Sequence, residues 1–247
     1  MKKILKAGVL IAFLLSSSLL KSQVLISLLF GDKLNSPKIE FGLVGGLNRS
    51  YFLDYNNSSG LNNFNIGFYF HLLLKNNSYI STGVLVKSNS GATGMPTYSL
   101  DNPDLNDLFS TGTLTTKVNY FYVPILFQQR FYQRFYAELG FQVGLRSKAY
   151  DYFDNNIDGN DLSYQIDVRD EYVRLDAGLM GGLGFKFSKK QKSPAVGVNY
   201  YYGLVNVSKL ENTNIKNSGI YIYGKIPIGV KKAEREQAEK EKAGNIK

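Results

Sequence analysis

The residues of this chain that could do chemistry are charged side chains at alternate positions of apolar stretches. Every second side chain of a strand points to the same face of the sheet. A buried charge must be paired, because an unpaired one costs several kcal/mol. We therefore expect structural ion pairs closing an interior, with a solute path or a proton relay as the functional alternative. Counting residues outward from each predicted turn gives the cross-strand pairing, which we call hairpin counting. It puts Glu138 diagonal to Arg130, and it puts Asp176 between Arg146 and Arg174.

A calcium site is the second chemistry that the sequence offers, in the polar run 154–161. The run matches the opening of a calcium-binding loop, in which oxygen ligands alternate and Gly159 permits the turn. The match ends at Gln165, which stands where the loop needs a bidentate glutamate. Such residues also favour solvated turns, so a turn is the preferred interpretation and a metal site the alternative. The candidate ligands are Asp154, Asn156, Asp158 and Asp161.

Catalysis is not expected. The chain has one histidine, His71, and no cysteine, which is too few ligands for a zinc site of the usual composition. A nucleophilic triad of an outer-membrane hydrolase would need its histidine among carboxylates at the outer mouth, whereas His71 falls near the other end of its strand. We expect no enzyme activity and no cofactor.

The elements that must position these residues are eight stretches in which apolar and polar residues alternate. In the clearest one, Phe135–Ser147, the odd-numbered positions up to Leu145 are apolar, and the even-numbered positions hold tyrosine, glycine, glutamine and charge. This period of two indicates a strand with one apolar and one polar face. Glu40, Lys186 and Lys225 fall on the polar face with the five charged residues above. The predicted strands are Lys38–Leu53, Leu61–Leu74, Ser78–Lys87, Leu114–Phe131, Arg134–Ala149, Tyr172–Phe187, Pro194–Leu204 and Ser218–Val230.

The connections between these strands are alternately short and long, which is typical of barrels in the outer membrane. The predicted fold is all-β: an eight-stranded antiparallel up-and-down transmembrane β-barrel with its apolar face toward lipid. A soluble lipocalin-like barrel with the apolar face around a ligand is the rival. It would leave Gly, Tyr, Met and Gln on a surface where soluble proteins carry Lys and Glu. The long connections, expected outside the cell, are Asp54–Gly60, Ser88–Thr113, Tyr150–Glu171 and Val205–Asn217.

The two ends of the chain give the compartment and the domain organisation. Residues 1–22 have the basic start and the apolar core of a cleaved signal peptide, too short and interrupted for a membrane helix. Residues 23–37 are expected to form a periplasmic or interfacial segment, residues 38–230 the barrel, and residues 231–247 a charged periplasmic tail. A signal peptide followed by spanning strands predicts the outer membrane of a Gram-negative cell.

The charge distribution argues against a nucleic-acid partner. The net charge of +9 includes four lysines in residues 1–22, which leaves +5 for the rest of the chain. Positive charge gathers in 188–193 and in the tail, while 88–113 and 150–171 are acidic. A nucleic-acid site would need a basic stripe on one face.

The abundant tyrosines are expected in two places. One group would form aromatic girdles at the membrane interfaces, and the other would pack the lumen. The girdle candidates are Tyr51, Tyr79, Tyr200 and Tyr202, and the lumen candidates are Tyr120, Tyr122, Tyr136 and Tyr221.

Three places in the sequence carry a family resemblance. They are the start after the leader, Gln23–Ser36 with Ile39–Gly46; Tyr120–Phe127, of the form Y-x-x-[IV]-P-[IL]-L; and Phe135–Gly144, of the form F-Y-x-E-x-G-x-x-x-G. On these motifs the chain resembles the PorT-type family of small outer-membrane β-barrels from Bacteroidota-like bacteria. The resemblance implies an eight-stranded outer-membrane barrel with extracellular loops, and some members of the family take part in gliding or type IX secretion.

Three functions follow as hypotheses. The first is a non-enzymatic scaffold or interaction module that contacts extracellular proteins through its long acidic loops. The second is an accessory component of a protein-secretion assembly with periplasmic protein partners. The third, a small-solute pore, is disfavoured because side chains fill the lumen of an eight-stranded barrel.

Overall fold

The computed structural model describes residues 34–55, 58–210 and 213–229. The predicted signal peptide, most of the predicted segment 23–37 and the predicted tail 231–247 lie outside the described residues. No helix in the described part of the chain is long and apolar enough to cross a membrane.

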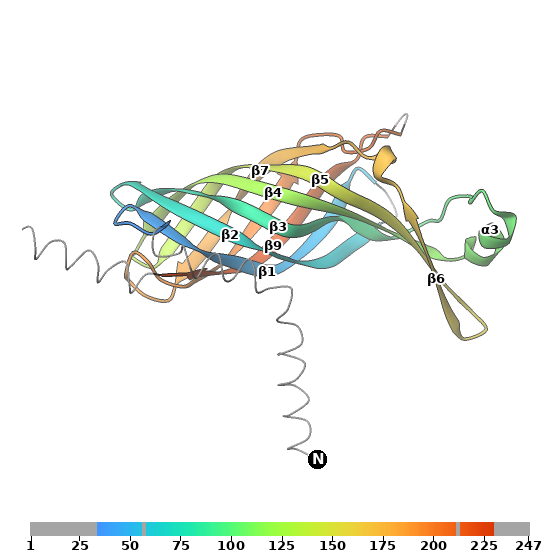
Figure 1. The fold of residues 1–247 in the computed structure, drawn as a ribbon, viewed down its shortest axis with the longest axis horizontal. Helices are drawn as coiled ribbons and strands as arrows, with labels where there is room; N and C mark the ends of the chain where they lie inside the picture. Colours follow the sequence, from blue (N-terminus) through green and yellow to red (C-terminus); the bar gives the residue numbers. More distant parts are fainter. Residues whose placement is uncertain (1–33, 56–57, 211–212, 230–247) are drawn as a thin grey trace, which may run out of the picture.

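Eight antiparallel strands of the described chain form a closed ring (Figure 1). Each strand pairs with the next along the chain, apart from the step from β5 to β7, and the pairing of β1 with β9 closes the ring. This confirms the predicted up-and-down barrel. The ring strands are β1 (Ile39–Leu53), β2 (Ser59–Lys75), β3 (Ser78–Met95), β4 (Thr113–Phe131), β5 (Phe135–Ile157), β7 (Leu175–Lys186), β8 (Ala195–Gly203) and β9 (Lys216–Pro227).

The barrel turns its apolar face outward. Along β5, the side chain of Leu139 is 68% exposed whereas its neighbour Glu138 is 3% exposed. The same alternation surrounds the ring, so lipid is the solvent that this outer face fits, and the lipocalin-like alternative is wrong. Exposed apolar residues of the outer face include Leu47, Phe64, Phe121, Phe141, Leu145, Leu183, Val198, Ile222 and Ile226.

The short connections all lie at one end of the barrel, which we call the short-turn end. Asn76 and Asn77 both have positive φ, as do Tyr132 and Gln133. Two consecutive residues with positive φ form the type I′ turn, whose twist matches that of the strands it joins. The opposite end, which carries the long connections, is the long-loop end.

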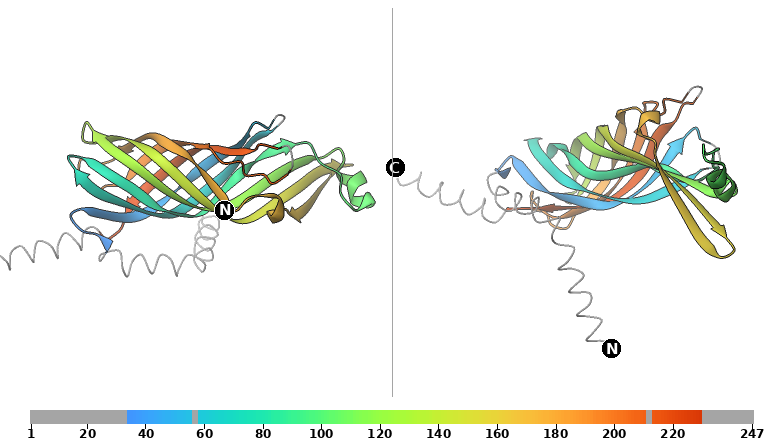
Figure 2. Two further views of the ribbon diagram at one scale, coloured as in Figure 1. Left: turned by 90° about the horizontal axis from the view of Figure 1, so that it is seen from above. Right: turned by 45° about the vertical axis from the view of Figure 1, so that its right-hand side comes forward.

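The long-loop end has more regular structure than the sequence analysis predicted. β3 runs on to Met95, β5 runs on to Ile157, and β6 (Asn160–Asp167) pairs with β5 outside the ring. A short helix, α3 (Pro103–Phe109), begins after Asn102, whose side chain accepts a hydrogen bond from the backbone N–H of Asp104. Figure 2 shows β6 and α3 projecting beyond the ring. The predicted loops 88–113 and 150–171 are therefore partly strand and helix.

The lumen is packed with tyrosines that lie opposite glycines. A Cβ atom on Gly184 would fall on the ring of Tyr136 of the neighbouring strand. Glycine thus leaves the space in which each ring lies against the barrel wall. The paired positions are Tyr69 with Gly42, Tyr122 with Gly144, Tyr136 with Gly184 and Tyr223 with Gly197.

The tyrosine prediction was correct for the lumen group and wrong at one girdle position. Tyr120, Tyr122, Tyr136 and Tyr221 are buried, whereas Tyr200 and Tyr202 are exposed. Tyr79 is also buried, at 3% exposure. Its place in β3 puts it on the same face as Ser81 and Leu85, so proximity to a strand end did not indicate the face.

Candidate functional site

Two regions gather polar side chains in unusual density, one in the lumen and one at the long-loop end. The first is the lumen charge cluster, which we define as Glu40, His71, Glu138, Lys186 and Lys225. It draws residues from β1, β2, β5, β7 and β9, and all five are buried. Such a cluster joins strands that are not neighbours in the ring.

One half of the cluster is built around Glu40. Its carboxylate accepts hydrogen bonds from the Tyr69 hydroxyl at 2.6 Å and from Lys186 Nζ at 3.2 Å. His71 Nδ1 lies 3.6 Å from Glu40 Oε1. The two oxygens of the Glu40 carboxylate thus contact a lysine, a tyrosine hydroxyl and an imidazole. These contacts offset the free-energy cost of removing the carboxylate from water.

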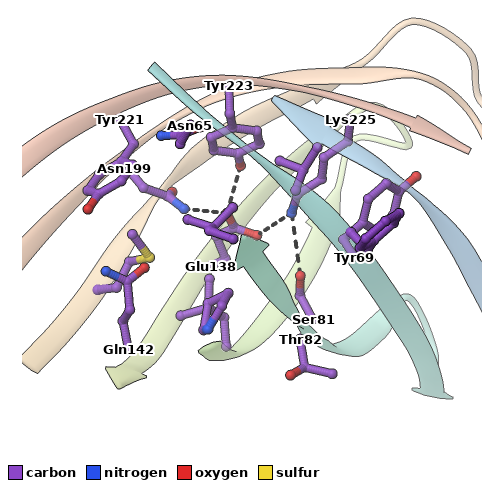
Figure 3. Close-up of a pocket in the computed structure, with 16 residues that line it drawn as sticks. Asn65, Tyr69, Ser81, Thr82, Glu138, Gln142, Asn199, Tyr221, Tyr223 and Lys225 are labelled. Atoms are coloured by element: carbon purple, nitrogen blue, oxygen red, sulfur yellow. Dashed lines mark hydrogen bonds and ion pairs between the residues drawn. The ribbon is translucent and has the colours of Figure 1, made fainter. Parts of the chain in front are cut away.

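The other half is built around Glu138 (Figure 3). Its Oε1 accepts hydrogen bonds from the Tyr223 hydroxyl at 2.6 Å and from Asn199 Nδ2 at 2.7 Å, and its Oε2 lies 3.3 Å from Lys225 Nζ. Lys225 Nζ also lies 3.3 Å from His71 Nε2. His71 therefore stands between the two ion pairs, and the cluster is continuous from Glu40 to Glu138.

The predicted partners of the lumen charges differ from those in the structure. Glu138 pairs with Gln128 and is thus diagonal to Arg130, as hairpin counting predicted for Arg130, but its cationic partner is Lys225. Arg130 donates to the backbone carbonyls of Gln133 and Lys189 at the short-turn end. The arginine that was expected beside Glu138 therefore stabilises turns and not the cluster.

Asp176 has hydrogen-bond donors in place of the expected arginines. Its carboxylate accepts from the hydroxyls of Tyr122 at 2.6 Å and Tyr201 at 2.9 Å, and from Asn217 Nδ2 at 2.8 Å. Arg146 donates instead to the carbonyl of Val173. Arg174 is exposed.

Sequence reasoning put Glu40, Lys186 and Lys225 on the lumen face but did not find which carboxylate each cation meets. The pairs Glu40–Lys186 and Glu138–Lys225 each join strands that are not adjacent. Counting along a hairpin gives only neighbouring positions, so these contacts depend on the closure of the ring.

The space left in the lumen is small. A cavity of about 50 Å³ lies beside Glu138, Asn199, Tyr223 and Lys225. Since a water needs roughly 10–15 Å³ by the same measure, it has room for only a few waters. At this level, buried side chains of the described strands therefore occupy most of the lumen.

The second region is the long-loop unit, which we define as residues 88–119 and 146–171. Phe153 is fully buried and lies with its ring 5.0 Å from Tyr98 and 6.2 Å from Phe109 of α3. Tyr164 of β6 contacts both phenylalanines. Four aromatic rings thus pack the helix, the hairpin and the connection before α3 into one folded unit.

One carboxyl in the long-loop unit is buried without a cation. Asp151 accepts hydrogen bonds from Thr116 Oγ1 and, at 3.2 Å, from the Tyr98 hydroxyl. Burial outweighs these two bonds and raises the pKa of Asp151 to about 6. The carboxyl is therefore partly protonated in mildly acidic water.

The run 154–161 forms the tip of the β5–β6 hairpin. Asp158 and Gly159 both have positive φ and make a two-residue turn. Asn156 donates to Asp161 at 2.7 Å and accepts from the backbone N–H of Gly159. The described residues hold no group of three or more His, Cys, Asp or Glu placed to bind a metal ion. The geometry is that of the hairpin turn; calcium binding by Asp154, Asn156, Asp158 and Asp161 stays a prediction without structural support.

The comparison with protein families agrees with the fold. A family described as "Outer membrane protein beta-barrel domain" matches residues 31–209, which is more than half of the chain. No curated protein matches. Among solved structures, Ail, the attachment invasion locus protein of Yersinia pestis, is 15% identical, covers 77% of this chain and 99% of its own, and gives a TM-score of 0.40.

Two further structures match with lower identities and lower TM-scores. Neisserial surface protein A is 9% identical with a TM-score of 0.36, and covers 75% of this chain and 96% of its own. OprG from Pseudomonas aeruginosa is 10% identical with a TM-score of 0.34, and covers 77% of this chain and 94% of its own.

Proposed function

Because the chain belongs to the outer membrane protein β-barrel domain family and lies in the outer membrane, we propose that it is a non-enzymatic surface scaffold. In this proposal the long-loop end faces the outside of the cell, and the barrel anchors it in lipid. The finer family assignment, to the PorT-type barrels, is part of the same proposal. It rests on the motifs at Tyr120–Phe127 and Phe135–Gly144.

The observation that carries the proposal is the folded, acidic long-loop unit. Its aromatic rings are packed, so its surface is organised before any partner binds, which lowers the entropy cost of binding. Its outer surface is strongly acidic, and charge of one sign steers partners of the other sign. The exposed carboxylates are Asp101, Asp104, Asp107, Asp154, Asp158, Asp161, Asp167 and Asp170. An extracellular protein with a basic surface fits this unit.

The lumen supports the same proposal from the other side. Its charges are paired with one another or hydrogen-bonded to tyrosines, and its cavity holds only a few waters. An interior of this kind stabilises a barrel and does not favour the alternative of a solute path or a proton relay. The binding surface is then the long-loop end.

A role as an accessory component of a secretion assembly is the second candidate. It is favoured by the sequence of residues 231–247, which is rich in lysine and glutamate, as an interaction segment for another protein would be. A periplasmic protein would be the partner. This candidate predicts that function depends on the tail and not on the long-loop unit.

The experiment compares cells that carry one altered copy each. Asp154→Asn, Asp158→Asn and Asp161→Asn together neutralise the hairpin tip, and a second strain lacks residues 231–247. Lys189→Gln with Lys190→Gln at the short-turn end is the matched surface control. The readouts are attachment of cells to a basic protein coating and the amount of protein released into the medium.

We expect the tip variant to lose attachment and to keep secretion, while the control keeps both. Loss of secretion in the tail-deleted strain, with normal attachment in the tip variant, would support the second candidate instead. A faster band for unboiled than for boiled protein in SDS checks that each variant still folds. Normal attachment and secretion in both altered strains would contradict both candidates.

A further inference from the structure

Basic side chains follow directly above the apolar belt on the β4–β5–β7 side of the barrel. The outward apolar residues end at Phe121 on β4, Leu145 on β5 and Leu175 on β7, each more than 45% exposed. Lys117 lies on the outer face of β4, four residues from Phe121 toward the long-loop end. Lys148 of β5 pairs with Asn119 of β4, which lies two residues from Phe121 in the same direction. Positive charge therefore begins where the apolar surface ends.

Two arginines, Arg146 of β5 and Arg174 just before β7, follow directly after Leu145 and precede Leu175 at this edge, on the other face of their strands. The register of β4 and β5 shifts between Asn119 and Tyr120, so that three residues of β5, from Arg146 to Lys148, span two of β4. The backbone N–H of Arg146 donates to the carbonyl of Arg174 at 2.8 Å, and its Nε donates to the carbonyl of Val173 at 3.3 Å. These bonds hold Arg146 and Arg174 side by side where β5 separates from β7.

The two arginines line an open hollow of about 500 Å³. One acidic residue in it is already paired, since Arg169 binds Asp167 at 2.8 Å. In the described part of the chain, no carboxylate lies within 4.0 Å of the Arg146 or Arg174 guanidinium. The hollow thus offers two guanidinium groups without an ion pair, and Asp170 is the second carboxylate on its rim. Its lining is Arg146, Ser147, Asp167, Arg169, Asp170 and Arg174.

We propose that this hollow binds the phosphate of a phosphorylated lipid headgroup in the outer leaflet. Guanidinium groups bind phosphate oxygens in a fork geometry, and these bonds are stronger than neutral ones. The acyl chains of such a lipid would lie along Leu145, Leu175 and Phe121, which begin directly below. A free phosphate ion would gain nothing from that apolar surface, so a lipid is the favoured source.

The proposal rests on the orientation given under the proposed function, with the long-loop end outside. It also separates two charged surfaces along the barrel axis, one basic and one acidic. Lys117 and Lys148 lie on the outer face just above the apolar belt, with the hollow of Arg146 and Arg174 beside them, whereas the exposed carboxylates of the hairpin tip lie farther along β5 and β6. An anionic lipid surface attracts the first group and repels the second, so both effects favour a hairpin that stands away from the membrane.

The test measures lipid binding by the purified full-length protein in detergent micelles, using native mass spectrometry. Three probes are used: a bis-phosphorylated glycolipid of the lipid A type, the same glycolipid without phosphates, and inorganic phosphate. The variant is Arg146→Gln with Arg174→Gln. The matched control, Lys189→Gln with Lys190→Gln, removes the same charge at the short-turn end.

The parent and the control should retain the phosphorylated glycolipid and not the phosphate-free one. The arginine variant should bind it about 10-fold more weakly or worse, since charge-assisted bonds are lost. Equal binding by variant and parent would overturn the proposal, as would equal binding of the two glycolipids. Binding of inorganic phosphate as tight as that of the glycolipid would show a free-anion site and overturn the lipid assignment.

The result is independent of the attachment experiment above. Lipid binding in micelles needs neither the acidic tip nor an extracellular partner. Lipid binding without tip-dependent attachment would therefore leave this inference standing and remove the scaffold proposal alone.

Discussion

Glu138 and Lys225 carry opposite charges and are both buried in the lumen, so each charge is compensated by the other. Their atoms lie 3.3 Å apart, and both residues are buried. Removing one member of a buried pair leaves an uncompensated charge. This lowers stability far more than replacing both members by apolar side chains.

We expect Lys225→Met to lower the free energy of unfolding by about 3–5 kcal/mol. Replacing both Glu138 and Lys225 by methionine should recover part of that loss, because no charge is then left unpaired. Urea unfolding of the detergent-solubilised protein, followed by the gel shift, measures both. Lys190→Met changes an exposed lysine at the short-turn end and should have little effect. Equal urea midpoints for Lys225→Met and Lys190→Met would show that the pair does not stabilise the barrel.

Asp151 makes the stability of the long-loop unit depend on pH. Its pKa in the folded protein is about 6, above the ordinary value of 3.8, because the carboxyl is buried. Between about pH 4 and pH 6 the carboxyl of Asp151 is ionised in the unfolded chain but still protonated in the folded one. The free energy of unfolding therefore falls as the pH rises through this range, and it is level above it. The loss by pH 7 is on the order of 3 kcal/mol.

Asp151→Asn keeps an acceptor for Thr116 and Tyr98 but cannot titrate. We expect its unfolding free energy to equal or fall below that of the parent at pH 4 and to exceed it at pH 7. Urea unfolding of the two proteins across this range is the measurement. If the unfolding free energies of parent and variant changed with pH in the same way, the pKa of Asp151 would not be raised by burial.

At the scale of elements, the ring depends on the match between tyrosines and glycines on neighbouring strands. We expect Gly184→Ala to destabilise the barrel, because the added Cβ meets the Tyr136 ring, which is fully buried and has little room to move. The cost should be about 1–3 kcal/mol. Gly224→Ala is the control, since its Cβ would meet nothing nearer than 3.9 Å. The two urea midpoints should differ, and coincident midpoints would rule out the steric argument.

The ring strands could be predicted from the sequence because one face of each must be apolar. In Phe135–Leu145 every second side chain contacts the outside, so the pattern alone gave the face. The partners of the lumen charges could not be predicted in the same way. Lys225 meets Glu138 only after β9 closes on β1, and a contact set by ring closure leaves no local pattern.

β6 was missed although its sequence carried the information. Leu162, Tyr164 and Ile166 alternate with polar residues, and the Asp158–Gly159 pair before them is a strong hairpin indicator. The run of carboxylates favoured a solvated loop or a calcium loop in the sequence analysis. The apolar alternation was the better guide, since Tyr164 packs on Phe109 and Phe153.

At the scale of the whole molecule, the filling of the described lumen leads us to expect a barrel that does not conduct ions. Two ion pairs and several buried tyrosines pack the lumen, and a cavity of about 50 Å³ lies beside the Glu138–Lys225 pair. We expect no steady conductance when the purified protein is inserted into planar lipid bilayers. A large porin in the same bilayer confirms that channels can be recorded. Reproducible single-channel steps from the folded protein would contradict the closed lumen and revive the pore hypothesis.

The β5–β6 hairpin ends in the exposed turn residues Asp158 and Gly159, and a Cβ on Gly159 would meet no atom within 4 Å. Exposed turns of this kind tolerate foreign sequence, because an inserted peptide disturbs only the turn itself. The ring would still fold around its own core. With the long-loop end outside the cell, as proposed above, a peptide inserted between Asp158 and Gly159 would be displayed at the cell surface.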